Sequence, residues 1–356
     1  MRDQISGRGG FKRQASHAMK RKKSNLESFL AKKASARRAS VIDQYRLTAG
    51  AIQENWAIDV EFSGGPLDGL QELCLRMDAP AAIGNSRSRI QEFEILKLAH
   101  QGGVRVPEPL FFCEDKELTK RPFFLMRRIR GVADARTVTQ EKRTSDSRNQ
   151  LLAEIGTELS VIHRLKPTGS TFQFLAKPRI APAPYVIKNC LDALDVLPQP
   201  LPVLEWGLRW AQLNLPKATK KVLCHRDYRT GNLMIDGNHL IGVLDWEFAG
   251  WCDPMEDVGW FCAKCWRFGF DDREAGGIGL RTAFYHAYEA ASRRTIDHEA
   301  VKFWEVMAHI RWAIVAHQQG ERFASYGEKS LEPAMTAFIA PQLEWEVMKM
   351  TEGWGV

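Results

Sequence analysis

The sequence predicts an α+β fold of two lobes, in which a small antiparallel sheet precedes a larger, mainly helical part. A chain of 356 residues is long enough to divide into two lobes or domains. Short strand-like runs lie in its first third, and longer helix-like apolar patterns follow. We therefore expect a tail over residues 1–40, an N-terminal lobe over 41–131 and a C-terminal lobe over 132–356.

The first 40 residues differ from the rest of the chain in charge. They hold 12 Lys and Arg against 2 Asp and Glu, although the net charge of the whole chain is only +7. They have few large apolar residues and no sustained period, which predicts a disordered tail. Lys20–Lys23 could contact nucleic acid or an anionic surface, but a solvated extension is the preferred interpretation. A chain that begins near Ser40 is expected to keep its melting temperature.

In the N-terminal lobe, the sequence predicts a helix over residues 42–55 and a strand over 57–62. A glycine-rich segment follows, with Gly64, Gly65 and Gly69 after Ser63. Glycines let a backbone approach a ligand closely and present N–H groups to phosphates, whereas a simple hairpin turn is the alternative interpretation.

The next strand is predicted over residues 72–77. Alternation places Leu73, Leu75 and Met77 on one face and Cys74 and Arg76 on the other. The rest of this lobe is predicted to contain a helix over 88–100 and strands over 110–113 and 123–126.

The C-terminal lobe is predicted to be mainly helical. A helix over residues 149–165 would face the core, with His163 as a packed, hydrogen-bonded side chain. Seven prolines make residues 166–202 an irregular insertion with one short helix near 185–194. Further elements are expected as strands over 222–223, 233–235 and 240–244 and as helices over 258–266, 276–293 and 298–324, with Asp253 as an N-cap.

The segment from Cys224 to Asn232 carries the strongest chemical signal. Asp227 is followed by Asn232 and then by Asp245, and a hairpin that turns at Asp236–Gly237–Asn238 would bring Asn232 and Asp245 to the same end of a small sheet. Carboxylate and amide oxygens suit Mg²⁺, which takes its other ligands from phosphates and water. This polar set is typical of phosphoryl transfer from ATP.

At these residues the chain resembles the aminoglycoside phosphotransferase-like family of small-molecule kinases, from about residue 42 to the C-terminus. The resembling stretches are His225-x-Asp227-x4-Asn232, Leu244–Glu247 and Asp253-Pro254-x2-Asp257. The sequence is similar to the bacterial branch related to the kinase-like domain that is fused to some acyl-CoA dehydrogenases. The resemblance implies a protein-kinase-like bilobal fold and a dependence on ATP and Mg²⁺.

The resemblance also implies residue roles. Asp227 would act on the acceptor hydroxyl, Asn232 and Asp245 would hold Mg²⁺, and His225 and Asp257 would support the loop. Arg76 falls where kinases place a phosphate-binding lysine, with Glu92 as its expected ion-pair partner and Glu94 as the competing candidate. The nucleotide contacts would come from Ser63, Gly64, Gly65, Gly69, Arg76 and Glu92 and, at the hinge, from Met126 and Arg128.

Some alternatives stay open. Arg226 gives the His-Arg-Asp of protein kinases, but the short segment between Asp245 and Asp253 leaves no long activation segment. A non-catalytic pseudokinase is disfavoured because Asp227, Asn232 and Asp245 are all present. Glu247 remains a possible further ligand of the metal.

The acceptor and the compartment are less tightly constrained. Charges of both signs in the C-terminal lobe fit a hydroxyacyl-CoA-like acceptor at least as well as an aminoglycoside or macrolide. Seven cysteines without framework spacing indicate a reducing compartment, and we expect a cytoplasmic protein. No apolar run reaches the roughly 18 residues that would suggest a membrane span.

Overall fold

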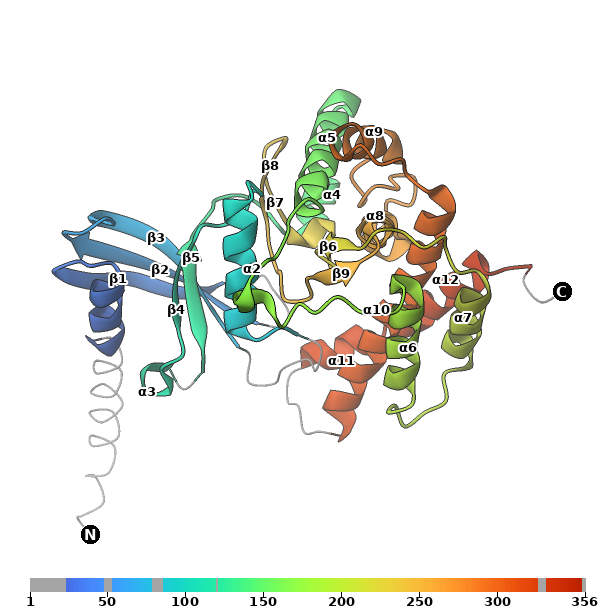
Figure 1. The fold of residues 1–356 in the computed structure, drawn as a ribbon, viewed down its shortest axis with the longest axis horizontal. Helices are drawn as coiled ribbons and strands as arrows, with labels where there is room; N and C mark the ends of the chain where they lie inside the picture. The colour runs from blue at the N-terminus through green and yellow to red at the C-terminus, as the bar shows by residue number, and fades with distance from the viewer. Residues whose placement is uncertain (1–23, 48–52, 79–85, 120, 326–330, 354–356) are drawn as a thin grey trace, which may run out of the picture. The chain divides into compact units, whose positions relative to one another are not determined.

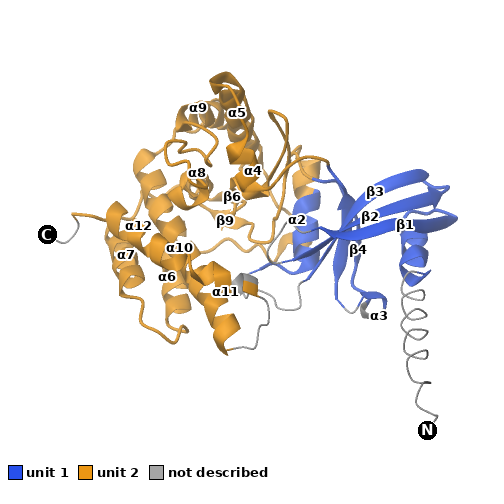
Figure 2. Cartoon of the chain, turned by 180° about the vertical axis from the view of Figure 1, so that it is seen from behind, with its two compact units in different colours: residues 1–97, 107–129 blue, residues 98–106, 130–356 orange. Residues whose placement is uncertain are grey.

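The computed structural model describes residues 24–47, 53–78, 86–119, 121–325 and 331–353. The chain forms two compact units, coloured blue and orange in Figure 2. Unit 1 comprises residues 1–97 and 107–129, and unit 2 comprises residues 98–106 and 130–356. Unit 1 contains a five-stranded antiparallel sheet and unit 2 is mainly helical, so the predicted fold class is confirmed (Figure 1).

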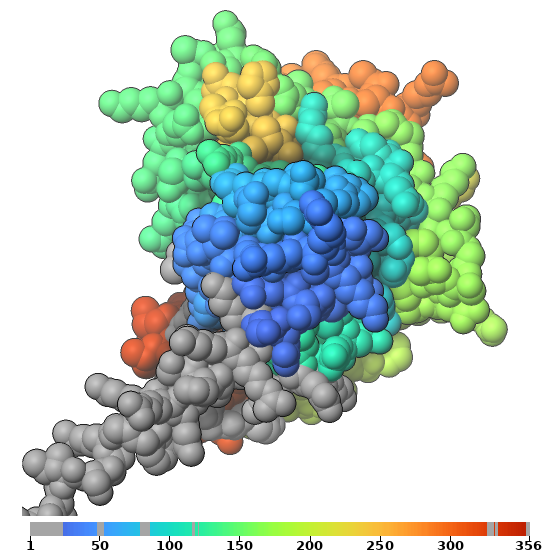
Figure 3. Space-filling view, turned by 90° about the vertical axis from the view of Figure 1, so that its left-hand side faces the viewer, coloured from blue at the N-terminus to red at the C-terminus, as the bar shows by residue number. Residues whose placement is uncertain are grey.

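The sheet of unit 1 has the strand order β1-β2-β3-β5-β4. Its strands are β1 (Arg38–Leu47), β2 (Glu54–Ser63), β3 (Gly69–Met77), β4 (Pro109–Cys113) and β5 (Phe123–Arg127). Neighbouring strands are antiparallel throughout. β1 is an edge strand, and the blue atoms of the N-terminal strands lie at the centre of Figure 3.

Two helices cover opposite faces of this sheet. Side chains of successive strand residues point to opposite faces, so Phe123 and Phe124 mark the two sides. Phe29, in the helix over residues 24–33, contacts Phe123 with ring centroids 5.7 Å apart. Phe93, in α2 (Arg89–Gln101), contacts Phe124 at 5.7 Å. Because both faces are covered, residues 73–77 of β3 are all buried, and the predicted alternation of this strand is retained.

The prediction for the start of the chain is partly wrong. Residues 1–23 lie outside the described residues, but residues 24–33 form a helix and β1 begins at Arg38, within the expected tail. Leu26 and Leu30 of the helix are buried in the same apolar cluster as β2 and β3. The helix expected over residues 42–55 is also wrong, since this segment contributes to β1 and β2. β1 is largely exposed and shows no apolar alternation, so pairing with β2 determines its conformation.

The buried helix changes the expectation for truncation. We predict that Leu30→Ala lowers the free energy of unfolding by about 2–5 kcal/mol, because Leu30 is fully buried against the sheet. Lys32→Ala, at an exposed position of the same helix, is the matched control and should change stability little. Denaturant unfolding of both variants checks this.

A chain that begins at Ser24 should likewise be more stable than one that begins at Ser40, and equal stability of the two would contradict the packing of the helix on the sheet.

Unit 1 also contains α3 (Lys116–Thr119). Unit 2 begins its helical part with α4 (Ala135–Gln140) and α5 (Ser145–Ile162), followed by α6 (Pro182–Leu194) and α7 (Pro202–Leu213). Both α6 and α7 start at a proline, which is favoured in the first helical turn. The short helix predicted near residues 185–194 is present as α6, which begins slightly earlier, whereas α7, which starts at the last residue of the proline-rich insertion, was not predicted.

The remainder of unit 2 contains one long helix and several shorter elements. Its elements are β6 (Val222–Cys224), β7 (Leu233–Asp236), β8 (His239–Val243), β9 (Gly250–Cys252), α8 (Pro254–Cys262), α9 (Arg281–Ser292), α10 (His298–Ser325), α11 (Leu331–Ala337) and α12 (Ala340–Met350). α10 packs against α7, α8, α11 and α12, while α9 packs on α5. Among the described helices, none combines the length and apolarity needed to cross a membrane. All seven cysteines lie in the described residues and are free thiols.

Candidate active site

The loop after β6 and the hairpin β7–β8 hold the central residues of the candidate site. Leu233 pairs with Val243 in the hairpin, and the N–H of Leu244 donates to the carbonyl of Asn232 at 2.8 Å. The turn of this hairpin lies between Asp236 and His239, with Gly237 in the left-handed region. The hairpin thus brings Asn232 and the segment that begins at Leu244 to one end, as the spacing of the motif predicts.

The Asp227 carboxylate accepts hydrogen bonds from three side chains. The Asn232 amide nitrogen lies 2.6 Å from Oδ2, the Trp260 indole nitrogen 3.0 Å from Oδ1, and Arg229 Nε 3.1 Å from Oδ1. Asp227 is only 8 % exposed, so these bonds fix its orientation in a mostly dry environment. The orientation of the carboxylate is therefore fixed, while its role toward an acceptor hydroxyl remains a prediction.

Trp260 and Arg229 were not predicted as site residues. Trp260 lies three residues after Asp257 on α8 and so shares a helix face with it. Arg229 lies inside the motif itself, two residues after Asp227. The helix spacing of Trp260 from Asp257 and the place of Arg229 within the motif are the signals that could have predicted both residues beside the loop.

Asn232 is oriented by its hydrogen bonds. Its amide nitrogen donates both to the backbone carbonyl of Asp227, at 2.9 Å, and to the Asp227 carboxylate. Both partners are acceptors, so the network identifies the nitrogen and directs the amide oxygen elsewhere. Within the described part of the chain no hydrogen bond to that oxygen is formed. It is therefore suited to bind a cation.

Asp245 is the second expected metal ligand. It has a left-handed backbone with φ of 64°, which is uncommon for a residue other than glycine and costs on the order of 1–3 kcal/mol. Asp245 is half-buried, whereas Glu247 is fully buried. Between these two carboxylates, the greater exposure of Asp245 favours it as the one that meets a metal ion.

His225 connects the loop to the segment that carries Asp245. Its Nε2 lies 2.9 Å from the carbonyl oxygen of Leu244, and its Nδ1 lies 3.3 Å from the N–H of Asp227. The carbonyl can only accept, so Nε2 carries the proton and Nδ1 accepts. The Trp246 ring lies against the imidazole, with centroids 4.9 Å apart. His225 thus has contacts that would support both segments.

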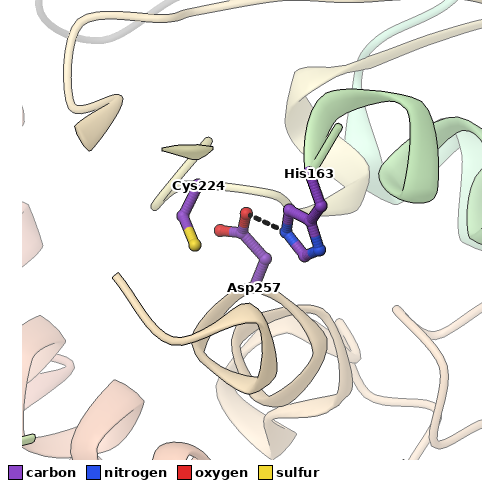
Figure 4. A group of neighbouring side chains, drawn as sticks. All are labelled: His163, Cys224 and Asp257. Carbon is purple, nitrogen blue, oxygen red and sulfur yellow. Dashed lines mark hydrogen bonds and ion pairs between the residues drawn. The ribbon is translucent and has the colours of Figure 1, made fainter. Parts of the chain in front are cut away.

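Asp257 anchors the start of the loop from α8. Its two carboxylate oxygens accept the backbone N–H groups of His225 and Arg226, each at 2.7 Å. Oδ2 also lies 3.1 Å from His163 Nε2 (Figure 4). Burial by itself raises the pKa of Asp257, but its hydrogen bonds and the neighbouring histidines outweigh burial, so the net pKa is lowered. The carboxylate is therefore ionised and holds Arg226 in a left-handed conformation, with φ of 66°.

His163, Cys224 and Asp257 also place three candidate metal-binding atoms within 4.8 Å of one another (Figure 4). Their existing bonds disfavour a metal ion. Both Asp257 oxygens already accept backbone hydrogens, and the other ring nitrogen of His163 lies 2.8 Å from the Tyr288 hydroxyl. Burial raises the pKa of the Cys224 thiol well above its usual range, whereas a metal would require the thiolate. We interpret the cluster as a hydrogen-bonded anchor, which agrees with the predicted packed role of His163.

Asp253 begins α8 in the predicted manner. Its side chain accepts the N–H of Met255 at 2.9 Å, and Pro254 occupies the first helical turn. This cap fixes the start of the helix that carries Asp257 and Trp260. The N-cap prediction is confirmed.

In unit 1, Arg76 and Glu92 form an ion pair. Arg76 Nε lies 2.9 Å from a Glu92 carboxylate oxygen, and both side chains are buried. Arg89 also binds Glu92, so two guanidinium groups share one carboxylate. The competing candidate, Glu94, pairs instead with Lys97 at 3.1 Å. The expected pairing is therefore present, while a phosphate-binding role for Arg76 remains a prediction.

The predicted phosphate contacts of the glycine-rich segment are contradicted by the strand register. Ser63 ends β2 and Gly69 begins β3, and Gly64 and Gly65 lie in the turn between these strands. Gly69 pairs with Phe62, whereas Arg76 pairs with Asn55 at the other end of the hairpin. Seven residues along a strand span roughly 23 Å, so this turn and Arg76 cannot hold the same phosphates.

Packing within unit 1, and not phosphate binding, explains why glycine is needed in this turn. Gly65 has φ of 83°, and a Cβ there would lie 2.6 Å from the carbonyl oxygen of Ala34. Close packing against the end of the N-terminal helix therefore requires glycine. The connection that leaves the sheet at the Arg76 end joins β1 to β2, because Leu47 pairs with Asn55. Residues 48–52 of that connection lie outside the described residues.

At the expected hinge, Met126 is half-buried in β5 and pairs with Cys74. The N–H of Arg128 donates to the carbonyl of Glu72 at 3.0 Å, and its guanidinium binds Asp59 and Glu72 at 2.8 and 3.0 Å. These bonds use the Arg128 N–H within unit 1, so that group is not available to read an adenine edge. The assignment of Met126 remains a prediction.

Comparison with known proteins adds three findings. A family model described as "Phosphotransferase enzyme family" matches residues 46–304. Mouse acyl-CoA dehydrogenase family member 10 is 25 % identical over 222 residues, which cover 60 % of this chain. The match spans about a fifth (21 %) of that relative's own length.

Solved structures share the fold at low sequence identity. The crystal structure of a putative aminoglycoside phosphotransferase from Ralstonia eutropha JMP134 matches with a TM-score of 0.69 and 19 % identity, over 91 % of this chain and 97 % of that one. Spectinomycin phosphotransferase APH(9)-Ia, in complex with ADP and spectinomycin, matches with a TM-score of 0.58 and 12 % identity, over 92 % and 98 %. These likenesses show a kinase-like fold.

Proposed function

The chain belongs to the phosphotransferase enzyme family, and on that premise we propose that it transfers the γ-phosphoryl group of ATP to a hydroxyl of a small molecule with the help of Mg²⁺. The observation that carries this proposal is the arrangement in unit 2 of Asp227, Asn232 and Asp245. The Asp227 carboxylate is fixed by three donors, while the Asn232 amide oxygen is turned away from them.

The chemistry follows from these positions. The acceptor hydroxyl would donate its hydrogen bond to Asp227, and its oxygen would attack the γ-phosphorus as the bond to the ADP oxygen breaks. The hydroxyl proton would pass to the Asp227 carboxylate. Asn232 and Asp245 would hold Mg²⁺, which neutralises charge on the phosphate oxygens. In unit 1, Arg76, kept in place by Glu92, would contact phosphate.

The proposed metal site predicts a specific defect. Asp245→Asn should weaken Mg²⁺-dependent nucleotide binding and reduce turnover together, because an amide is a poorer Mg²⁺ ligand than a carboxylate. Titration of Mg²⁺ with a fluorescent ATP analogue checks this. Asp272→Asn, at an exposed aspartate of unit 2, is the control. An unchanged metal dependence in the Asp245 variant would move the ligand role to Glu247 or to another carboxylate.

The charges around Asp227 favour a neutral or anionic acceptor over a polycation. Arg226 and Arg311 both bind Glu256, at 3.1 and 2.5 Å, and Arg229 binds Asp227. In these side-chain pairs, three guanidinium groups share two carboxylates. A polycationic aminoglycoside would need several unpaired carboxylates instead. A hydroxyacyl-CoA-like acceptor agrees with these charges and with the name of the mouse relative.

The acceptor class can be tested directly. We predict that, with ATP and Mg²⁺, hydroxyacyl-CoA compounds are phosphorylated with a higher kcat/KM than kanamycin or neomycin. ADP formation is measured for each compound, and the phosphate ester is identified by mass spectrometry. A macrolide is tested in the same assay as a second class of antibiotic acceptor. Efficient transfer to an aminoglycoside, with a KM in the micromolar range, would contradict the charge argument and indicate an antibiotic kinase.

A further inference from the structure

Arg229 occupies an unusual place beside Asp227. Its Nε lies 3.1 and 3.3 Å from the two oxygens of the Asp227 carboxylate. The side chain of Arg229 is 27 % exposed, whereas that of Asp227 is 11 % exposed. The guanidinium is therefore the more accessible member of the pair, and a molecule that approaches Asp227 meets Arg229 as well.

The terminal nitrogens of Arg229 remain open to a ligand. Within the described residues its hydrogen bonds are those of Nε to Asp227, and neither terminal nitrogen makes one. A guanidinium presents its donors in a rigid planar fork that matches the two oxygens of a carboxylate or phosphate. Arg229 can thus keep Asp227 on one edge and bind an anion through another.

The plane of this guanidinium is held by aromatic rings. Its central carbon lies 4.9 Å from the centroid of Trp266. Trp266 is buried and packs against Trp260 and Trp312, with ring centroids 5.5 and 5.2 Å apart. Trp260 in turn donates to Asp227. One rigid cluster therefore fixes both the carboxylate and the guanidinium, which lowers the entropic cost of binding an anion there.

The neighbouring arginines do not share this property. Arg226 and Arg311 meet at the carboxylate of Glu256, which is almost fully buried. Both are therefore already bound to one buried carboxylate of the protein frame. The charge of Arg229 is balanced only by Asp227, the carboxylate that would turn toward the acceptor hydroxyl.

We propose that Arg229 recognises a negatively charged group, a carboxylate or a phosphate, that the acceptor carries within a few bonds of its reacting hydroxyl. The proposal rests on the proposed kinase function, because it takes Asp227 as the group that receives the hydroxyl. It favours hydroxy acids and phosphorylated alcohols over a hydroxyacyl-CoA, whose thioester carries no charge near the hydroxyl. One guanidinium would contact both Asp227, which takes the hydroxyl, and the anionic group of the acceptor. The affinity should therefore depend on the spacing between the hydroxyl and the anionic group.

Binding without turnover tests this directly. The ligands are a matched three-carbon series: ω-hydroxypropionate, hydroxypropyl phosphate, propanediol and aminopropanol. Each is titrated by calorimetry into the full-length protein, which holds Mg²⁺ and a non-hydrolysable ATP analogue so that phosphate sites for the nucleotide are filled. The variants are Arg229→Gln, Arg229→Lys and the control Arg209→Gln, which removes an exposed guanidinium that bonds Gln212 on its own helix.

The wild type and Arg209→Gln should bind one or both anionic ligands more tightly than propanediol, and aminopropanol least. Arg229→Gln should weaken the anionic ligands by roughly 10²-fold, the scale of a lost charge-assisted pair, and Arg229→Lys by a smaller factor. Comparison of ω-hydroxypropionate with hydroxypropyl phosphate shows whether the site prefers a carboxylate or a phosphate. Lengthening the chain beyond the reach of one guanidinium should weaken binding again.

Three results would overturn the proposal. The first is equal binding of anionic and neutral ligands by the wild type. The second is an equal loss for both kinds in Arg229→Gln, which indicates that Arg229 only positions Asp227. If Arg229→Gln does not fold, Arg229→Lys is the test instead. The third result is then that Arg229→Lys prefers anionic over neutral ligands as strongly as the wild type does. Anion binding that depends on Arg229 without any phosphoryl transfer would contradict the kinase function instead.

Discussion

Asp227→Ala is expected to reduce phosphorylation of the acceptor by roughly 10²–10⁴-fold, the range for loss of a positioned general base. Its carboxylate is the group on which Asn232, Trp260 and Arg229 converge. Nucleotide binding should change little, because the expected metal ligands are Asn232 and Asp245. The measurements are steady-state turnover and the Kd of a fluorescent ATP analogue.

Two further variants sharpen this prediction. Asp227→Asn keeps the shape of the side chain but removes its charge, and it should be nearly as inactive as the alanine variant. Asp236→Asn, at an exposed aspartate on β7, should retain activity. Wild-type turnover in Asp227→Ala would remove Asp227 from the proposed mechanism.

Asp257→Ala should have the largest effect on stability. The substitution leaves the buried N–H groups of His225 and Arg226 without their acceptor and removes the partner of His163. Loss of one member of such a buried network costs about 3–5 kcal/mol. Turnover should fall as well, because the loop that carries Asp227 loses its anchor. Denaturant unfolding and turnover are measured together.

The control for Asp257 is Asp195→Ala, which removes the C-cap residue of α6 in a less buried place. If Asp257→Ala costs no more than this control, the anchor has been assigned wrongly. The lowered pKa of Asp257 adds a pH dependence. Its contribution to stability is present above the unfolded pKa, near the ordinary value of 3.8, and is lost as the pH falls through the lower folded pKa.

The sequence predicted those parts of the protein whose signals are local. The hairpin of β7 and β8 follows from two apolar runs around Asp236–Asn238, and it brings Asn232 and the Asp245 segment together. The N-cap at Asp253 follows from the proline after it. The partner of Arg76 was also predicted, because the resemblance to kinases implied a pair between Arg76 and Glu92 of the following helix.

The errors arose where distant parts of the chain decide the structure. β1 lacks an apolar alternation and becomes a strand through its pairing with β2. The helix over residues 24–33 lies in a basic segment, and only the buried face around Leu30 explains its order. The glycines at 64, 65 and 69 suggested a phosphate loop, but strand register places them at the end of β3 far from Arg76. Composition does not reveal at which end of a sheet a turn lies.

The central claim is that this chain moves a phosphoryl group from ATP to a small-molecule hydroxyl by means of Asp227. Phosphorus NMR of ATP, Mg²⁺, the protein and a mixture of hydroxy acids and hydroxyacyl-CoA compounds follows all phosphorus species at once. The account predicts a new phosphate ester that forms in step with ADP and is absent with Asp227→Asn. Formation of ADP with inorganic phosphate alone, or an ester that forms equally well with Asp227→Asn, would contradict it.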